Sequence, residues 1–557
     1  MAKVFNVTGI CTKHQNYMVD IHHRIDAIIS DYILKDKYFT IHKARQYGKS
    51  TLLYHLEEQL KKDYIVLSIS FEAADEYFQS PLSLARGFVM DISDCLHMQG
   101  IPDEILNEWE SPLQEQFPIR SLGKKITALC TSCEKEIILM IDEVDKNSDN
   151  QIFMSFLGLL RTKYLARTAK KDHTFKSVIL SGVYDIKNLK LKLNPGEETK
   201  YIPVCQMICQ QITAICKEEA NHLANKYARE YNSPWNIAAD FIIDMSFSKQ
   251  DIALMLADYE QDYQTGMDVA AVSTLIYEYT SGYPYLVSRL CQLTDERIAG
   301  TKNFPDKQNA WTRQGILAAE VLLRKESNAL FDDMVKKLTD FPQLKKMIQD
   351  ILFCGSKFPF EKENSLVSQG VDFGFLKEKD GNIAIENRIF ETKMYDLFLS
   401  ELAVHNDLYQ QSSIESSQYI THGKLQMDII MKKFYEHYME IYGDNNQKFV
   451  EEQGRKLFLL YLKPIINGTG NYYIEAQTRD RKRTDIIVDY LGEQYIIELK
   501  IWHGEEYNCR GEKQLFQYLD NYNKDKGYLL SFNFNQKKCT GIKEIFLEGK
   551  RILEVIV

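Results

Sequence analysis

The sequence predicts an α/β protein of several domains. Its 557 residues suggest about three to four domains at roughly 150 residues each. Apolar residues make up 45% and charged residues 26%, a balance that is typical of folded globular proteins and excludes wholesale disorder. Between residues 38 and 181, β-rich runs alternate with helical stretches, which indicates βαβ units and a parallel sheet.

Four β-rich runs define the predicted sheet of the N-terminal part. The third is almost wholly apolar, as expected for a strand buried on both faces of a parallel sheet. A helical pattern from Ser50 through Leu60 follows the first run, and a longer one at about 80–130 follows the second. The four runs are Tyr38–His42, Tyr64–Phe71, Glu136–Asp142 and Ser177–Ser181.

Helical patterns dominate the middle of the chain, and a second α/β pattern fills its end. A hairpin around Asp380 and Gly381 follows several short helical segments, which suggests a winged helix. The stretch at 403–424 is rich in Ser and Gln and suggests a linker. We therefore expect five parts: a core at 1–204, a helical lid at 205–335, a winged-helix-like domain at 336–402, the linker at 403–424, and a further α/β domain at 425–557.

Charge and apolar content limit the expected partners. The net charge is −10, but residues 421–557 carry 21 Lys and Arg against 20 Asp and Glu, so the acidic excess lies in the rest of the chain. A nucleic-acid contact is therefore more compatible with the C-terminal part. No apolar run approaches the ~20 residues of a membrane span and no secretion signal is visible, so we expect a cytoplasmic protein with reduced cysteines and no membrane contact.

A phosphate-binding loop is predicted where the first strand meets its helix. A tight turn there would point backbone N–H groups at a phosphate, at the positive end of a helix dipole. Lys49 would reach the β- and γ-phosphates of a nucleotide, and the Ser50 hydroxyl would bind Mg²⁺. The full motif has a glycine five residues before Gly48, where this chain has Lys43. The predicted nucleotide-binding residues of the loop are Arg45, Gln46, Tyr47, Gly48, Lys49, Ser50 and Thr51.

The end of the third run strengthens this prediction. Asp142 and Glu143 follow an apolar strand, so two acids arrive at the sheet edge where ligands bind in open α/β folds. Asp142 would hold the Mg²⁺, and Glu143 would orient or deprotonate the attacking water. Ser181, at the end of the fourth run, is a candidate contact to the γ-phosphate, with a strand-capping serine as the equal alternative.

The segment Tyr38–Ser50 resembles the motif of bacterial AAA-ATPase-like proteins that carry a C-terminal PD-(D/E)XK nuclease domain. The segments Pro234–Ala238, Asp244–Ser248 and Thr280–Arg289 are similar to that family as well. The resemblance implies a P-loop NTPase sheet close to that of STAND-type ATPases, followed by a helical lid and a winged helix. In this family the first glycine of the loop is commonly replaced, which agrees with Lys43.

The same resemblance implies contributions from other parts of the chain. Pro284, in the segment Gly282-Tyr283-Pro284, would lie near the adenine. An arginine from the lid or from a second copy would complete the ATPase site, and Arg161 and Arg289 are the candidates, with surface ion pairing as the alternative for each. An arginine from a second copy would make the protein a homo-oligomer.

A hairpin near the C-terminus carries a second group of candidate residues. Asp485 stands at the start of one β-rich run and Glu498 near the end of the next, so antiparallel pairing would bring them together. Glu498 and Lys500 are two residues apart and share one face of their strand. Burying a carboxylate and an ammonium in an apolar strand is costly unless they are paired or hold a metal.

This pattern has the shape of a PD-(D/E)XK site in a restriction-endonuclease-like α/β domain. Asp485 and Glu498 would ligate Mg²⁺, and an upstream acid, Glu452 or its neighbour Glu451, would complete the metal site. Lys500 would position or deprotonate the attacking water and stabilise the developing phosphorane charge. A salt-bridged hairpin without catalytic function is the alternative.

Two further features accompany this hairpin. Gln514 and Tyr518 are four residues apart on a predicted helix and match the Gln-x-x-x-Tyr signature of many of these nucleases, so Gln514 joins the predicted catalytic residues. The basic run Arg479–Arg483 would hold phosphates without reading sequence, or is simply an exposed basic loop.

The sequence therefore predicts an ATP-binding, ATP-hydrolysing protein coupled to a Mg²⁺-dependent nuclease that acts on nucleic acid, DNA more readily than RNA. The predicted cofactors are ATP and Mg²⁺. One alternative is a nucleotide-dependent switch or scaffold whose nuclease fold binds without cleaving. Another is a slow ATP-binding module with no turnover.

Overall fold

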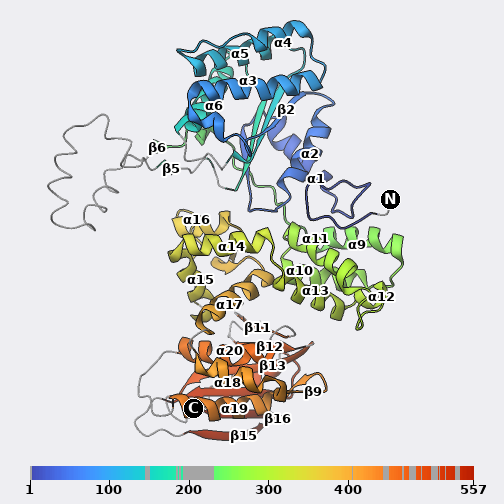
Figure 1. Cartoon of the computed structure of the whole chain (residues 1–557), viewed down its shortest axis with the longest axis vertical. Helices are drawn as coiled ribbons and strands as arrows, with labels where there is room; N and C mark the ends of the chain where they lie inside the picture. The colour runs from blue at the N-terminus through green and yellow to red at the C-terminus, as the bar shows by residue number, and fades with distance from the viewer. Residues whose placement is uncertain are drawn as a thin grey trace, which may run out of the picture. The chain divides into compact units, whose positions relative to one another are not determined.

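The structure, a computed structural model, divides into two compact units (Figure 1). The first unit consists of Thr8–Lys13 and Asp20–Ser246, and the second of Met1–Val7, His14–Val19 and Phe247–Val557. For part of the C-terminal region, including 470–475 and 484–485, only the backbone is described. The residues that the structure describes are 3–144, 151–183, 186, 190–191, 231–354, 356–403, 406–442, 451–466, 470–475, 484–490, 492–502, 512, 515–520, 522–533 and 540–557.

The first unit contains the predicted parallel sheet. Its strands are ordered β1-β4-β3-β2, and each neighbouring pair runs parallel, so the carboxyl ends of all four strands share one edge. The two central strands are buried along nearly their whole length, as expected when both faces of a parallel sheet are covered. The strands are β1 (Phe39–His42), β2 (Ile65–Ser70), β3 (Ile137–Asp142) and β4 (Ser177–Gly182), which confirms the four predicted runs.

A long helical insertion separates β2 from β3. Its first helix starts at Pro81 after Ser80, whose hydroxyl accepts a hydrogen bond from the backbone N–H of Ser83 at 3.0 Å, and α5 also starts at a proline, Pro118. Figure 1 shows α3, α4 and α5 gathered beside β2. The helices of this unit are α1 (His22–Ile28), the π-helical turn η1 (Ile29–Ile33), α2 (Lys49–Leu60), the short η2 (Asp75–Gln79), α3 (Pro81–Met98), α4 (Asp103–Glu110), α5 (Pro118–Ser132), α6 (Gln151–Thr168) and the short η6 (Pro234–Ile237); the two-residue strands β5 (Lys190–Leu191) and β6 (Tyr231–Asn232) pair with each other.

The middle of the chain, from Lys249 onward, forms the helical part of the second unit, and residues 205–230 of the predicted lid lie outside the described residues. A two-stranded hairpin of β7 and β8 turns at Asp380 (φ +53°) and Gly381 (φ +74°), and two positive φ angles are what a tight hairpin turn needs. The elements are α9 (Lys249–Tyr263), α10 (Val269–Thr280), α11 (Pro284–Leu293), the π-helical turn η7 (Thr294–Ile298), α12 (Lys307–Ala310), α13 (Arg313–Lys325), α14 (Ala329–Asp340), α15 (Pro342–Cys354), α16 (Ser365–Asp372), β7 (Leu376–Lys379), β8 (Asn382–Ile385) and α17 (Arg388–Ala403).

The stretch at 403–424 is not a linker, so that prediction is wrong. It contains α18 (Asp407–Glu415), the 3-10 turn η8 (Ser416–Tyr419) and the short strand β9 (Ile420–Thr421), and β10 (Lys424–Leu425) pairs with β9. Leu408 and Ser412, four residues apart on α18, are fully buried, and this helix packs against α20. A Ser- and Gln-rich composition is therefore compatible with a packed helix when its few inward positions fit the neighbouring helix.

The C-terminal part of the second unit is built on a mixed six-stranded sheet in the order β11-β12-β13-β14-β16-β15. The first three strands form an antiparallel meander, β14 and β16 run parallel to β13, and β15 is an antiparallel edge strand. The strands are β11 (Gly470–Glu475), β12 (Thr484–Tyr490), β13 (Glu493–Ile501), β14 (Lys526–Phe532), β15 (Gly541–Leu547) and β16 (Lys550–Ile556).

Helices cover both faces of this sheet. On one face lie α19 (Met427–Tyr442) and α20 (Glu451–Ile466), as Figure 1 shows, with Phe434 and Tyr438 against Phe532 of β14. On the other face, Leu515 and Leu519 pack with apolar side chains of β13, β14 and β16. Within the described part of the chain, no helix has the length and apolar character that a membrane crossing requires.

Candidate functional sites

The loop between β1 and α2 has the backbone of a phosphate-binding turn. Gly48 precedes the first residue of α2 in a left-handed conformation (φ +79°), and Gln46 is left-handed too (φ +57°). The first N–H groups of a helix have no partner within it, and they carry the positive end of its dipole. The 12-residue helix α2 therefore presents an anion-binding terminus at this loop.

Lys49 occupies the centre of this loop. Its side chain is buried, with 7% of the residue exposed, and its Nζ donates hydrogen bonds to the carbonyl oxygens of Lys43 at 2.8 Å and Ala44 at 3.1 Å. A buried ammonium needs such acceptors. The loop thus holds a positive charge at the place where the motif would accept phosphate.

Ser50 and Asp142 meet at the carboxyl edge of the sheet. The Ser50 hydroxyl donates a hydrogen bond to Asp142 Oδ2 at 3.1 Å, although the two residues are 92 positions apart. The other carboxylate oxygen, Oδ1, accepts the backbone N–H of Glu143 at 2.9 Å, and Glu143 is left-handed (φ +55°). One hydroxyl and one carboxylate are hard oxygen donors of the kind that Mg²⁺ prefers, so this pair fits the predicted ion.

The other predicted loop residues differ in exposure. Arg45 and Gln46 are exposed, whereas Tyr47 is buried, with Lys43 Nζ 5.8 Å from its ring centroid. Ser181 is fully buried in β4, beside Ile41 of β1, and among the residues that the structure describes its hydroxyl has no hydrogen-bond partner. Its position near the carboxyl end of β4 is compatible with the predicted phosphate contact.

Residues 8–13 also contact α2, and the sequence patterns did not predict this contact. The backbone N–H of Cys11 donates to Thr51 Oγ1 at 3.3 Å, and Cys11 O lies 2.8 Å from His55 Nε2. Thr51 and His55 are four residues apart and share one face of α2. No residue type or spacing in this segment signals the contact, because it depends on how the chain folds back.

The two candidate arginines and Pro284 have identifiable surroundings. Arg161 lies ten residues into α6, about 15 Å along the helix axis from its first residue, Gln151. Arg289 makes a two-pronged ion pair with Glu326, at 2.9 Å from Nε to Oε1 and 2.6 Å from a terminal nitrogen to Oε2. Pro284 is the buried first residue of α11. Their contributions to nucleotide binding stay predictions.

In the C-terminal sheet, Glu498 and Lys500 lie together as the alternation of β13 requires. Glu498 is fully buried, and Lys500, whose side chain is 17% exposed, places its Nζ 2.8 Å from Glu498 Oε1. Taking a carboxylate out of water costs several kcal/mol unless a counter-charge or hydrogen bonds compensate. The sheet therefore holds a buried carboxylate and an ammonium as one unit.

The hairpin register places Asp485 across from Glu498. Ile486 pairs with Ile497. One position further from the hairpin turn, the same antiparallel register sets Asp485 opposite Glu498. The side chains of Asp485 and Glu452 and the whole of Gln514 lie outside the described residues, as does the basic run 479–483. Among the described side chains, no three His, Cys, Asp or Glu residues are grouped closely enough to hold a metal.

Sequence analysis missed a second buried acid on the same face. Glu554 of β16 is fully buried and stands in one row with Leu529 and Glu498, with a single strand between the two acids. Its Oε2 lies 3.4 Å from Lys543 Nζ on β15. Burial, and then the nearby charge of Glu554, raises the pKa of Glu512. The signal was an acid within the apolar run Ile552–Ile556.

Residues 14–185 match the model of an AAA-like domain family. This region is thus an AAA-like P-loop ATPase domain, a class that binds ATP, typically with Mg²⁺. None of the curated proteins matches the chain at a significant level.

Several solved structures are similar to the chain at low identity. A Walker-type ATPase of Pyrococcus abyssi shares 12% identity, with a TM-score of 0.38, over 70% of this chain and 99% of its own. The ORC1 protein of Aeropyrum pernix, solved in complex with DNA, shares 11% identity with a TM-score of 0.26, over 71% and 96%. The ORC2 protein of Aeropyrum pernix, solved as ADPNP-ADP complexes, shares 10% identity with a TM-score of 0.32, over 72% and 98%.

Proposed function

We propose that this chain hydrolyses ATP and that its nucleotide state controls a Mg²⁺-dependent phosphodiesterase in the C-terminal domain, which acts on nucleic acid and on DNA in preference to RNA. The observation that carries the ATPase half is the contact of Ser50 with Asp142 beside the buried Lys49. It joins the two predicted halves of a nucleotide site, which lie far apart in the sequence.

At the nucleotide site, each side chain has a separate task. Lys49 would exchange its two carbonyl acceptors for phosphate oxygens, while the N–H groups at the start of α2 hold the same group. Ser50 and Asp142 would hold Mg²⁺, which neutralises phosphate charge when it is bound. Glu143 would orient the attacking water and accept its proton.

In the C-terminal domain, the proposal is supported by the buried pair of Glu498 and Lys500. A fully buried carboxylate next to an ammonium is what a site for a divalent cation and a phosphate needs, because each buried charge then has a counter-charge. Asp485, across the hairpin, would add a second oxygen donor. Lys500 would position the attacking water and stabilise charge that develops on the scissile phosphate.

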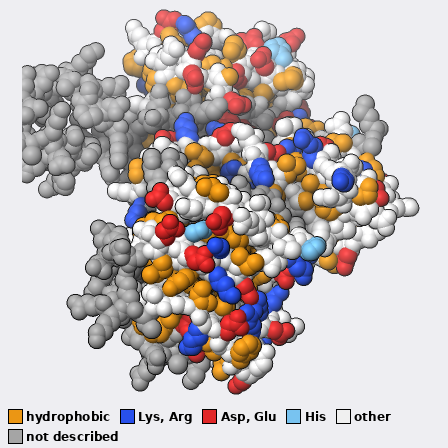
Figure 2. Space-filling model, turned by 60° about the horizontal axis from the view of Figure 1, so that its bottom comes forward, with side chains coloured by type: hydrophobic (Ala, Val, Ile, Leu, Met, Phe, Trp, Pro, Cys, Tyr) orange, Lys and Arg blue, Asp and Glu red, His pale blue; other side chains and the backbone are white. Residues whose placement is uncertain are grey.

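On the face that Figure 2 shows, the described side chains of this domain do not form a broad basic field. Figure 2 shows Lys and Arg side chains interspersed with Asp and Glu, and Lys526 and Arg551 both bind Asp428, at 2.6 and 2.9 Å. Nucleic acid would therefore be held by contacts close to the site rather than by long-range attraction, and we expect a moderate dependence of binding on salt.

The test is a cleavage panel with plasmid, linear duplex DNA and RNA, with Mg²⁺ or Mn²⁺, and with or without ATP. Phosphate release is measured in the same reactions. We expect metal-dependent cleavage that responds to ATP. Absence of cleavage under every condition, together with ATP-dependent binding of nucleic acid, would instead support the switch or scaffold. Binding of ATP without phosphate release would contradict the ATPase half.

A further inference from the structure

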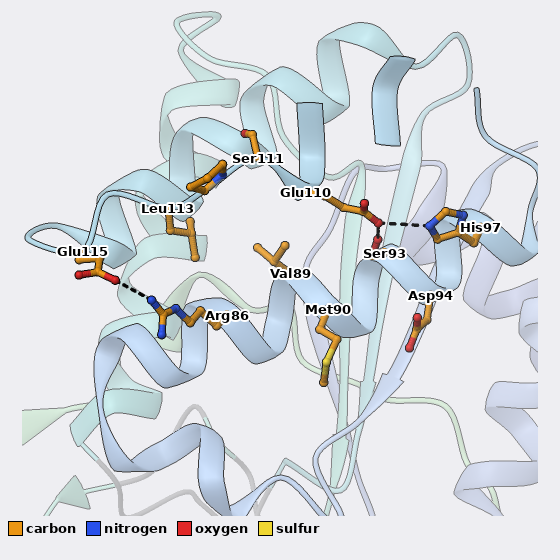
Figure 3. A pocket seen from close by; sticks show the side chains of 11 residues that line it. Arg86, Val89, Met90, Ser93, Asp94, His97, Glu110, Ser111, Leu113 and Glu115 are labelled. Atoms are coloured by element: carbon orange, nitrogen blue, oxygen red, sulfur yellow. Dashed lines mark hydrogen bonds and ion pairs between the residues drawn. The ribbon is translucent and has the colours of Figure 1, made fainter. Parts of the chain in front are cut away.

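A groove lies in the helical insertion of the first unit, and none of the residues assigned to ATP is among those that line it (Figure 3). One wall is a single face of α3, and the other is the connection from the end of α4 to α5. The cavity has a volume of about 490 Å³. We call it the α3 groove; its lining residues are Arg86, Val89, Met90, Ser93, Asp94 and His97 on α3, and Glu110, Ser111, Pro112, Leu113 and Glu115 opposite.

Hydrogen bonds from two side chains fix the position of the second wall of the α3 groove. The indole nitrogen of Trp109 donates a hydrogen bond to Val89 O at 2.9 Å, which fixes the end of α4 against α3. Lys125 of α5 holds the following turn, with Nζ 2.6 Å from Trp109 O and 2.8 Å from Ser111 Oγ. These hydrogen bonds fix the end of α4 and the turn that follows it, and so hold the second wall in place against α3.

Polar contacts occupy the two ends of the groove. At one end Arg86 pairs with Glu115 at 2.6 Å, so the only Arg or Lys of the lining is neutralised. At the other end Glu110 Oε1 accepts a hydrogen bond from the Ser93 hydroxyl and lies 3.2 Å from His97 Nε2. These two contacts, that of Ser93 first, lower the pKa of Glu110.

Four apolar side chains, Val89, Met90, Pro112 and Leu113, lie among the polar residues that line the groove. In Figure 3 Val89 and Leu113 face each other across it, and Met90 lies on the α3 wall. Met90 is 56% exposed, a large exposure for a methionine. A flexible methionine beside other apolar side chains is typical of surfaces that receive a partner's side chain.

The segment of the chain that forms the groove is rich in acidic residues, and three of them, Asp94, Glu110 and Glu115, line it. Residues 71–136 carry twelve Asp and Glu against five Lys and Arg, a net charge of −7 out of −10 for the whole chain. Such a surface repels nucleic acid. It also disfavours a second copy, because the same acidic face would meet itself. A segment with positive charge next to an apolar side chain complements it.

We propose that the α3 groove binds a basic amphipathic segment of a protein partner. An apolar side chain of that segment would sit between Val89 and Leu113, and its Lys or Arg side chains would meet the carboxylates of Asp94 and Glu110. This contact is independent of the proposed ATPase and nuclease sites. It gives the first unit a place where a partner could dock without covering the nucleotide loop.

The test uses a fluorescent synthetic helix of about 18 residues, with Leu on one face and Lys on the other, and fluorescence anisotropy with the full chain. The control peptide carries Glu at every Lys position. We expect the Lys peptide to bind, the Glu peptide not to bind, and the affinity to fall with salt because the charged rim is exposed. No binding of the Lys peptide up to about 100 µM would overturn the proposal.

Two variants with the same change in charge locate the contact. Met90→Lys with Asp94→Lys should weaken binding at least about tenfold. Met98→Lys with Glu134→Lys, two exposed positions of the insertion outside the groove, should change it less than about twofold. Equal losses in both would show non-specific attraction to an acidic surface and would overturn the assignment.

A variant that binds the peptide more tightly shows that changes in affinity come from the groove and not from a loss of folding. Arg86→Ala releases Glu115 from its ion pair and should tighten binding of the Lys peptide about two- to threefold. A misfolded variant would not bind more tightly. A dimer of the unaltered chain that the Met90→Lys and Asp94→Lys variant no longer forms would assign the groove to a second copy and contradict the proposal.

Discussion

The nucleotide site and the C-terminal carboxylate site place their acids at different depths. Asp142 stands at the end of a strand, is only partly buried, and binds a hydroxyl from a distant loop. Glu498 lies inside a sheet, is fully buried, and binds Lys500 of its own strand. The first site is assembled from strand ends and loops, and the second from the register of neighbouring strands.

This difference in depth predicts how substitutions at each site affect binding and folding. A site at strand ends can exchange ligands with solvent, and its side chains contribute little to the core, so substitutions there should change binding more than folding. A buried acid depends on a permanent counter-charge, so its neutralisation should affect chemistry and leave a buried ammonium partner less well compensated. The predictions below test this contrast.

The largest effect is expected for Glu498→Gln, which keeps the shape of the side chain but removes its charge. Metal-dependent cleavage should fall by roughly 10³-fold, because the cation and the scissile phosphate lose their central carboxylate. Initial rates of cleavage of a labelled duplex measure the loss. Glu554→Gln is the matched control, because Glu554 is equally buried in the same row of the sheet. An equal loss in the control would show that the site does not depend on Glu498 in particular, because Glu554, with one strand between them, would matter as much.

At the nucleotide site, Glu143→Gln should separate binding from turnover. The amide cannot accept a proton from water, so ATP hydrolysis should slow by about 100-fold. ATP affinity should stay within about threefold, because Glu143 has no assigned contact with the phosphates. Phosphate release measures the rate of hydrolysis, and equilibrium binding of a fluorescent ATP analogue measures the affinity. Hydrolysis by the variant at the rate of the unaltered protein would show that Glu143 does not accept the proton of the attacking water.

Lys49→Ala should weaken ATP binding by about ten- to hundredfold, the expected value of one charge-assisted contact to phosphate. Lys43→Ala is the control, because Lys43 offers its backbone carbonyl to the same loop while its own ammonium lies over the Tyr47 ring. Titration calorimetry measures both. If the two variants lose affinity equally, the loop is not organised around Lys49.

The smallest effect concerns the metal. In the unaltered protein, chelation of Mg²⁺ should lower ATP affinity about tenfold, whereas in Asp142→Asn the affinities with and without Mg²⁺ should agree within about twofold. Binding titrations in Mg²⁺ and in a chelator provide the comparison. A variant that still responds to Mg²⁺ as the parent does would show that the Ser50 and Asp142 pair does not hold the ion.

The same contrast shows what the sequence could predict. The four parallel strands, the turn at Gly48 and the pair of acids after β3 were predicted because each depends on a short local pattern. The hairpin of β12 and β13 was predicted for the same reason. The linker prediction failed because composition does not reveal that Leu408 and Ser412 face a neighbouring helix.

Features that depend on distant pairing were beyond the sequence. Glu554 joins the row of Glu498 only through the parallel pairing of β14 with both β13 and β16. The contact of Cys11 with Thr51 and the α3 groove, which depends on Trp109, likewise require the folded arrangement of separate segments. The sequence contains these residues, but not the register that brings them together.

The central claim is that ATP at the N-terminal loop governs cleavage at the C-terminal acid. The most direct measurement is the rate of cleavage of a duplex as a function of ATP concentration, in the unaltered protein and in Lys49→Ala. The account predicts that the response of the unaltered protein is half-maximal near its dissociation constant for ATP, and that the response of the variant shifts to about ten- to hundredfold higher ATP concentration. Equal rates with and without ATP in both proteins would contradict it.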